Sequence, residues 1–120
     1  MAKVVTFGEY IRESREERFA KDRSFSVRQV AKRIDIEPSY LSKIERGQQP
    51  PPGEETIRNL ARELDQDADV LLALAGKVSS DLLDVVRARP ALFADLLRQL
   101  KSLPDKAVLR LVREVRDGQW

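Results

Sequence analysis

The sequence predicts an all-α protein in which five short helices form a first domain and further helices form a C-terminal segment. Apolar residues recur three and four positions apart along most of the chain, which is the period of an amphipathic helix. No stretch shows the alternation of apolar and polar residues that is typical of strands. Helix-starting residues, prolines and glycines divide the pattern into short segments, so we expect connected helices rather than one long helix.

Composition restricts the classes of function. The chain has 120 residues, of which 42% are hydrophobic and 35% are charged, and this length predicts one compact domain or a small domain with an appendage rather than a larger multidomain enzyme. Cysteine is absent, which excludes disulfides and thiolate metal sites, and histidine, the commonest general base, is absent too. We therefore predict no enzymatic activity, no catalytic residues, no metal site and no cofactor.

Charge and hydropathy indicate the compartment and the kind of partner. The net charge is only +2, so any basic surface must be local. No apolar run reaches the roughly 18–20 residues that span a bilayer, and the first residues lack the basic-then-apolar layout of a signal peptide. We expect a cytoplasmic protein that does not contact membranes.

Two capping boxes open the first two predicted helices. Thr6 with Glu9 starts the first helix, and Ser26 with Gln29 starts the second, because each hydroxyl can accept a hydrogen bond from a free amide. Residues 20–24 read as the connection between them. The apolar stripes comprise Phe7, Tyr10 and Ile11 in the first helix and Val27, Val30, Ala31 and Ile34 in the second.

A sharp corner and a third helix follow. Asp35 is one of the few non-glycine residues that tolerate left-handed geometry, Pro38 suits the first position of a helix, and Gly47 marks its end. The predicted helix over residues 38–46 has Leu41, Ile44 and Glu45 on one side and Ser39, Ser42, Lys43 and Arg46 on the other, with Tyr40 between them. Its outward face is therefore polar and basic.

Two further helices complete the first domain. The prolines of residues 48–53 predict a loop, because they cannot continue a helix. Glu54 and Glu55 suit the first turn of a fourth helix, whose apolar stripe is Ile57, Leu60, Ala61 and Leu64. A fifth helix is predicted over residues 68–75, and Gly76 ends it, so we place the first domain at residues 1–76.

Residues 77–120 predict a helical C-terminal segment. Three helical patterns begin there, with Ser79 or Ser80, Pro90 and Pro104 in their first turns. Two of them carry apolar stripes, formed by Leu92, Phe93, Leu96, Leu97 and Leu100 and by Ala107, Val108, Leu111, Val112 and Val115. These stripes either close a monomer core or form a self-association surface. The sequence does not decide whether Trp120 packs on these helices.

The residues SVRQVAKRIDIEPSYLSKIERG, positions 26–47, combine two short helices, a tight corner and a polar second helix. This stretch resembles the Cro/repressor-type helix-turn-helix family of DNA-binding regulators, often labelled XRE, most specifically at Val30, Ala31, Ile36 and residues 40–47. The resemblance covers residues 6–76 and implies a five-helix lambda-repressor-like domain. It also implies that residues 38–46 form the recognition helix.

The resemblance assigns roles to individual side chains. The major groove of B-form DNA is about 12 Å wide, which admits one helix, and each base pair presents a distinct pattern there. By resemblance, Ser39, Tyr40, Ser42 and Lys43 reach base edges or neighbouring phosphates, although the Tyr40 ring could instead pack on the domain. Arg46, Gln48 and the amide of Gly47 are expected to contact phosphate, as are Ser26 and Arg28.

Glu45 has a different interpretation. It lies near the apolar side of the third helix, where an unpaired buried carboxylate would be costly. In the related domains an arginine of the first helix pairs with this position. Arg15 is the matching residue, and Arg12 is the alternative. We interpret Arg15 and Glu45 as a structural ion pair.

Three features depart from the family pattern. Several extra residues lie between the first helix and Phe25, so either the helix is longer or the connection bulges. Asp35 stands at the corner where glycine is commoner, and Glu37 stands where Ser, Thr or Asp usually caps the recognition helix. The charge of Glu37 would also repel a nearby phosphate.

The sequence therefore predicts a DNA-binding transcriptional regulator, most simply an autoregulatory repressor. We expect it to bind a palindromic double-stranded DNA operator as a homodimer, because two half-sites about 34 Å apart specify more base pairs than one recognition helix can read. The C-terminal stripes would form the dimer. The alternative is an antitoxin-like or adaptor protein whose C-terminal helices bind a partner protein, such as a toxin or a protease, with DNA binding secondary.

Overall fold

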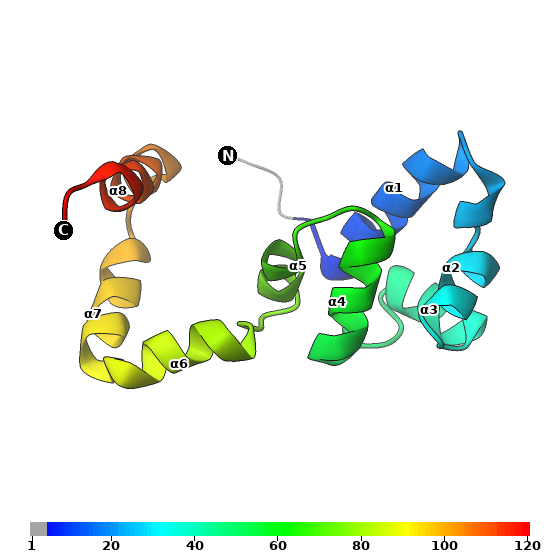
Figure 1. Ribbon diagram of the computed structural model, residues 1–120, viewed down its shortest axis with the longest axis horizontal. Helices are drawn as coiled ribbons and strands as arrows, with labels where there is room; N and C mark the ends of the chain where they lie inside the picture. The colour runs from blue at the N-terminus through cyan, green and yellow to red at the C-terminus, as the bar shows by residue number, and fades with distance from the viewer. Residues whose placement is uncertain (1–4) are drawn as a thin grey trace. The chain divides into compact units, whose positions relative to one another are not determined.

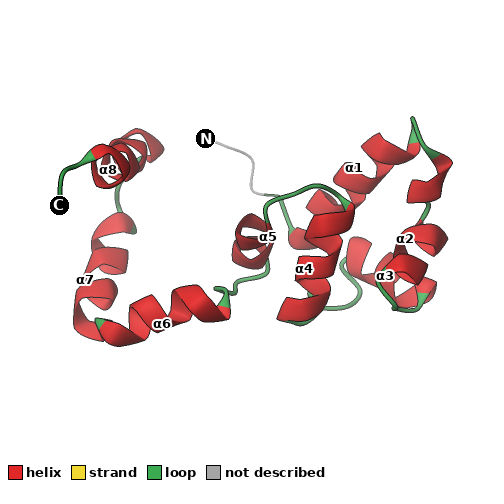
Figure 2. Cartoon of the chain, in the orientation of Figure 1, coloured by secondary structure: helices red, strands yellow, loops and turns green. Residues whose placement is uncertain are grey.

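The computed structural model describes residues 5–120, and this range contains helices and no strand (Figures 1 and 2). The helices are α1 (Phe7–Phe19), α2 (Val27–Arg33), α3 (Pro38–Glu45), α4 (Glu54–Glu63), α5 (Ala68–Leu74), α6 (Ser80–Ala88), α7 (Pro90–Leu100) and α8 (Asp105–Asp117), with a 3₁₀ turn, η1 (Arg23–Phe25), before α2. The predicted all-α class is confirmed. The contacts divide the chain after Ser79, whereas the sequence placed the domain boundary at Gly76.

The starts of the first helices follow the capping signals. The Thr6 hydroxyl accepts a hydrogen bond from the Glu9 amide at 3.1 Å, and the Ser26 hydroxyl accepts one from the Gln29 amide at 3.2 Å. Glu37 precedes α3 without making a side-chain cap, so Pro38 alone, at the first position, supplies the local starting signal. The predicted helix over residues 38–46 is one residue shorter in the structure, since Arg46 is its C-cap.

The four helices α2 to α5 end in the same way. The residue after each C-cap has a positive φ, which is 60° at Asp35, 72° at Gly47, 51° at Asp65 and 73° at Gly76. The next amide then bonds back to a carbonyl in the last helical turn, in the pairs Ile36–Ala31, Gln48–Lys43, Gln66–Ala61 and Lys77–Leu72. This is the Schellman arrangement, which satisfies free carbonyls and reverses the chain sharply. These sharp reversals let the five short helices of the N-terminal domain pack against one another.

One apolar core joins these five helices. Its buried residues are Phe7, Ile11, Val30, Ala31, Ile34, Leu41, Ile44, Ile57, Leu60, Ala61, Leu64, Leu71 and Leu72. Nearly all of them lie on the stripes that the sequence predicts. Tyr10 adds a link across the core, because its hydroxyl donates to the Gln66 side-chain oxygen at 2.8 Å.

The extra residues before Phe25 form an ordered turn that includes η1. α1 ends at Phe19, so the helix is not extended, and η1 occupies part of the connection predicted over residues 20–24. The Asp22 carboxylate accepts a hydrogen bond from the Ser24 amide at 2.9 Å and thereby caps η1.

The C-terminal unit, residues 80–120, has helices but no buried side chain in any of them. Pro104 caps α8 rather than occupying its first position. The Trp120 indole nitrogen donates to the Val115 carbonyl at 2.9 Å, yet 92% of this residue is exposed. The helices of this unit therefore form without enclosing a core of their own.

Candidate nucleic-acid interface

Helix α3 is fixed to the N-terminal domain through one face. Leu41, Ile44 and Glu45 are buried, and they are the three residues that helical spacing places on the inner side. α1 approaches this helix closely at Gly8, where an added Cβ would lie 3.0 Å from the Glu45 carbonyl oxygen and closer still to that of Ile44. Only glycine fits there, because backbone atoms cannot move aside. The missing side chain of Gly8 therefore lets the backbones of α1 and α3 approach closely.

The opposite face of α3 is open to solvent. Ser39, Lys43 and Arg46 are exposed, and Ser42 is half-buried. Arg46 is oriented along the helix, since its Nε donates to the Ser42 carbonyl at 3.3 Å. Tyr40 is half-buried and packs against the core, so both interpretations of this residue fit in part. The outward face is therefore short, polar and positively charged.

The predicted phosphate-binding residues differ in exposure and in hydrogen bonding. Arg28 and Gln48 are exposed, whereas Ser26 is half-buried and its hydroxyl already caps α2. The Gly47 amide donates to the Ile44 carbonyl at 3.1 Å, so it is occupied within the protein, contrary to its predicted role. The exposed, cationic side chain of Arg28 is therefore a stronger candidate for a phosphate contact than the Ser26 hydroxyl or the Gly47 amide.

Arg15, rather than Arg12, lies against Glu45. The Arg15 Nε and Nη2 atoms donate to the two carboxylate oxygens of Glu45 at 2.7 and 2.9 Å, and both side chains are buried. The Arg15 Nη1 atom also donates to the Phe25 carbonyl at 3.2 Å. Arg12 pairs with Glu16 at 3.0 Å on the surface, and the hydrogen bond and charge of Glu16 raise the pKa of Arg12. The buried pair thus joins α1, α3 and the turn before α2.

A small polar cavity of about 170 Å³ lies beside the buried pair. Its lining comes from α1, the start of α2 and α3, and comprises Arg12, Arg15, Glu16, Val27, Ser42, Glu45 and Arg46. The cavity therefore adjoins the outward face of α3 at Ser42 and Arg46.

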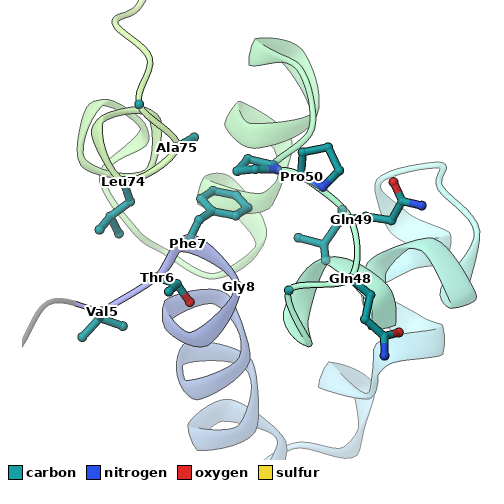
Figure 3. A pocket seen from close by; sticks show the side chains of 13 residues that line it. Val5, Thr6, Phe7, Gly8, Gln48, Gln49, Pro50, Leu74 and Ala75 are labelled. Carbon is teal, nitrogen blue, oxygen red and sulfur yellow. The ribbon is translucent and has the colours of Figure 1, made fainter.

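A larger groove, of about 710 Å³, lies elsewhere on the N-terminal domain (Figure 3). The start of α1, the proline loop and the end of α5 line it, and Phe7 lies across from Pro50, whereas Gln48 and Gln49 point away (Figure 3). Its lining is mainly apolar.

No cluster of acidic, His or Cys side chains among residues 5–120 could hold a metal ion. In the same range, no helix has the length and apolar character needed to cross a membrane.

In the structure, a short helix and a tight corner precede α3, whose inner face is buried and whose polar face is exposed. This arrangement defines a helix-turn-helix protein of the DNA-binding class. A family model described as a helix-turn-helix domain matches residues 6–74, which is more than half of the chain. The chain therefore belongs to the helix-turn-helix domain family, consistent with the resemblance to Cro/repressor-type regulators. No curated protein and no solved structure matches the chain.

Two contacts between helices of the N-terminal domain have no counterpart in the sequence-based predictions. Gly8 looks like a poor helix residue, and only its place on the face of Phe7 and Ile11 could have suggested a close helix contact. The bond between Arg33 and Glu63, at 2.7 Å, joins α2 to α4. Residues so far apart in the sequence give no local signal of such pairing.

Proposed function

We propose that this protein is a sequence-specific transcriptional regulator that binds a palindromic operator as a homodimer and represses transcription from the promoter at that operator. One observation carries the proposal: the inner face of α3 is fixed by the buried Leu41, Ile44 and Glu45, while its polar face is exposed. A helix presented in this way can enter the major groove without rearrangement of the domain.

The predicted DNA-contacting side chains of α2, α3 and the residues next to these helices divide into two roles. Ser39, Tyr40, Ser42 and Lys43 face the bases, and Lys43 donates to guanine acceptors, since lysine and arginine are the commonest partners of guanine. Ser26, Arg28, Arg46 and Gln48 contact the phosphates, which fixes the register of the helix without reading sequence. The negative charge of Glu37 at the start of α3 keeps phosphates away from that end.

The proposal of a homodimer rests on the C-terminal unit. A helical unit of about 40 residues seldom folds alone without a metal, disulfides or oligomerisation. Here α6, α7 and α8 contain no buried residue, and the predicted dimer residues are exposed or half-buried. The exposed members are Leu92, Leu96, Leu97, Val112 and Val115, and the half-buried ones are Phe93, Leu100, Val108 and Leu111. Self-association would remove this apolar area from water.

Repression follows from occupancy of the operator. A small regulator that covers a promoter excludes the polymerase by its presence alone. If the operator lies at the promoter of its own gene, the protein limits its own synthesis.

The test is selection of binding sequences from random duplexes, together with the mass of the protein in solution. We expect a two-fold symmetric consensus with half-site centres one helical turn, about 34 Å, apart, and a mass of two chains. Selection without any enrichment would overturn the proposed sequence-specific function.

A second candidate function uses the same exposed C-terminal faces. They would bind a different protein, as in an antitoxin or adaptor, and DNA binding would be secondary. A monomeric mass, with the apolar faces of α7 and α8 covered only in a complex with another protein, would favour this candidate over the homodimer.

A further inference from the structure

The segment around the extra turn concentrates positive charge. Residues 18–33 contain six basic residues and one acidic residue, although the whole chain has a net charge of only +2. The basic residues are Arg18, Lys21, Arg23, Arg28, Lys32 and Arg33, and the acidic residue is Asp22. The segment comprises the end of α1, η1 and α2, and Figure 1 shows it continuing directly into the motif that carries α3.

The turn is held in one shape by contacts on several sides. Asp22 caps it, the Arg15 Nη1 atom donates to the Phe25 carbonyl at 3.2 Å, and the Arg33 Nη1 atom donates to the Ser24 carbonyl at 2.8 Å. The Phe25 ring lies under two guanidinium groups, 5.7 Å from Arg18 and 5.2 Å from Arg33. The turn is therefore a fixed support, and side chains on it keep their places relative to α2.

The cations of this segment fall into two groups. Arg33 forms an ion pair with Glu63 at 2.7 Å, and Arg18 lies 4.0 Å from Asp65, so both serve the protein's own packing. Lys21, Arg23, Arg28 and Lys32 are exposed, and within residues 5–120 none of these four forms an ion pair. The positive charge of these four side chains is available to a ligand.

Arg23 is also positioned in advance. Its guanidinium lies 4.5 Å from the centre of the Phe19 ring, which restricts the side chain while leaving its N–H edge free to donate. An arginine stacked in this way is well suited to an oxyanion, because less conformational freedom is lost on binding. Lys21, two residues earlier on the same turn, supplies a second positive charge.

We propose that the turn is a second DNA-contacting element, in which Lys21 and Arg23 bind backbone phosphates outside the base pairs that α3 reads. This inference rests on the proposed DNA-binding function. When the second helix of the motif lies in the major groove, the first helix crosses the phosphate backbone. Here α2 is that first helix, and the turn extends the chain from its N-terminal end. Lys21 and Arg23 therefore lie further along the same backbone than Arg28.

The test is the salt dependence of DNA binding by the full chain with Lys21→Ala and Arg23→Ala combined. Each phosphate neutralised by a protein cation contributes about 0.9 to the slope of log affinity against log salt. We expect the slope of the double variant to be shallower by about 1.8. Between 50 and 200 mM salt, the fold-loss of affinity of the double variant should therefore be about tenfold smaller than that of the parent. The loss at low salt should be equal on a selected duplex and on a random duplex, because phosphates carry no sequence information.

Two matched variants separate this effect from others. Lys21→Arg combined with Arg23→Lys keeps both charges and should keep the parental slope, even if loss of the Phe19 stack lowers stability. Lys106→Ala combined with Arg110→Ala removes the same charge from the C-terminal unit and should change the slope much less. If the parent binds DNA and the turn variant keeps its slope, the proposed phosphate site is wrong while the proposed function stands. If the parent binds no duplex at any salt concentration, both proposals fail.

Discussion

The guanidinium of Arg15 holds the carboxylate of Glu45 through two parallel hydrogen bonds of 2.7 and 2.9 Å, with side-chain exposures of only 8% and 4%. Paired charges this deeply buried attract strongly, but each would be costly without the other. The pair also joins the helix that opens the domain to the helix that we propose reads DNA. The orientation of α3 is therefore linked to the stability of the whole domain.

Glu45→Ala should lower both stability and DNA affinity. The substitution leaves the Arg15 guanidinium buried without its counter-charge, and breaking one side of a buried pair costs about 3–5 kcal/mol. Urea unfolding of the variant should show this loss. The control is Glu16→Ala, which removes the partner of the exposed Arg12 and should cost at most about 1 kcal/mol. An unchanged melting temperature for Glu45→Ala would show that the pair has no structural role.

Gly8→Ala should destabilise the N-terminal domain, although alanine normally favours a helix over glycine by about 1 kcal/mol. The new Cβ would lie 3.0 Å from the Glu45 carbonyl oxygen and nearer still to that of Ile44, and overpacking of this kind typically costs about 1–3 kcal/mol. The net effect on the free energy of unfolding should therefore be a loss, measured by urea denaturation.

Gly53→Ser provides the comparison for Gly8→Ala. A Cβ at Gly53 meets no atom within 4 Å, and serine is a preferred N-cap for α4, so this variant should be as stable as the parent or more so. If Gly8→Ala proved equally stable, α1 and α3 would have to separate without cost, which contradicts their close contact.

Local signals in the sequence predict most of the N-terminal domain. Thr6 and Ser26 cap helices as their spacing indicates, and Asp35 adopts the left-handed conformation expected at the corner. Asp65 follows Leu64 as Asp35 follows Ile34 and has the same conformation, so the same argument would have predicted it. Patterns confined to a few residues can be read because they depend only on backbone geometry.

Features that depend on distant residues could not be read in this way. The close contact at Gly8 depends on α3 lying against it, and the path of residues 20–25 depends on Arg15 and Arg33 bonding to carbonyls of that segment. The choice of Arg15 over Arg12 also follows from how α1 faces α3. The C-terminal unit has the predicted apolar stripes, but the sequence of a stripe does not show which surface packs against it.

Lys43→Ala should weaken binding to the selected operator more than binding to a random duplex. Lys43 is exposed on the outward face of α3, and loss of a base contact typically costs about 1–3 kcal/mol of discrimination. Titrations on both duplexes at one salt concentration measure the ratio. Arg46→Ala, at the end of the same helix, should reduce both affinities alike. Equal losses for Lys43→Ala would assign Lys43 to phosphate instead.

Asp22 should titrate below the ordinary value for an aspartate. The Ser24 amide donates to its carboxylate, and this bond lowers the pKa of Asp22 from 3.8. Because the folded-state pKa is depressed, the stabilisation from this cap is present above about pH 3.8 and is lost as the pH falls through the lower value. The side-chain carboxyl resonance, followed by NMR, should give a midpoint below 3.8, and the Ser24 amide should shift with it. A midpoint at or above 3.8 would mean that the cap does not form in solution.

A charge placed on an apolar stripe of the C-terminal unit should separate the proposed dimer. Leu97 on α7 and Val112 on α8 are 60% and 51% exposed, and a carboxylate at either position would have to be desolvated on association. Leu97→Asp combined with Val112→Asp should therefore shift the mass from two chains to one, measured by light scattering at equal concentration. Affinity for a palindromic operator should fall, whereas affinity for a single half-site should not, because the residues of α3 are unchanged. Gln99→Asp adds a negative charge to the exposed polar face of α7 and should leave the mass unchanged. A double variant that keeps the mass of two chains would show that these stripes do not form the dimer interface.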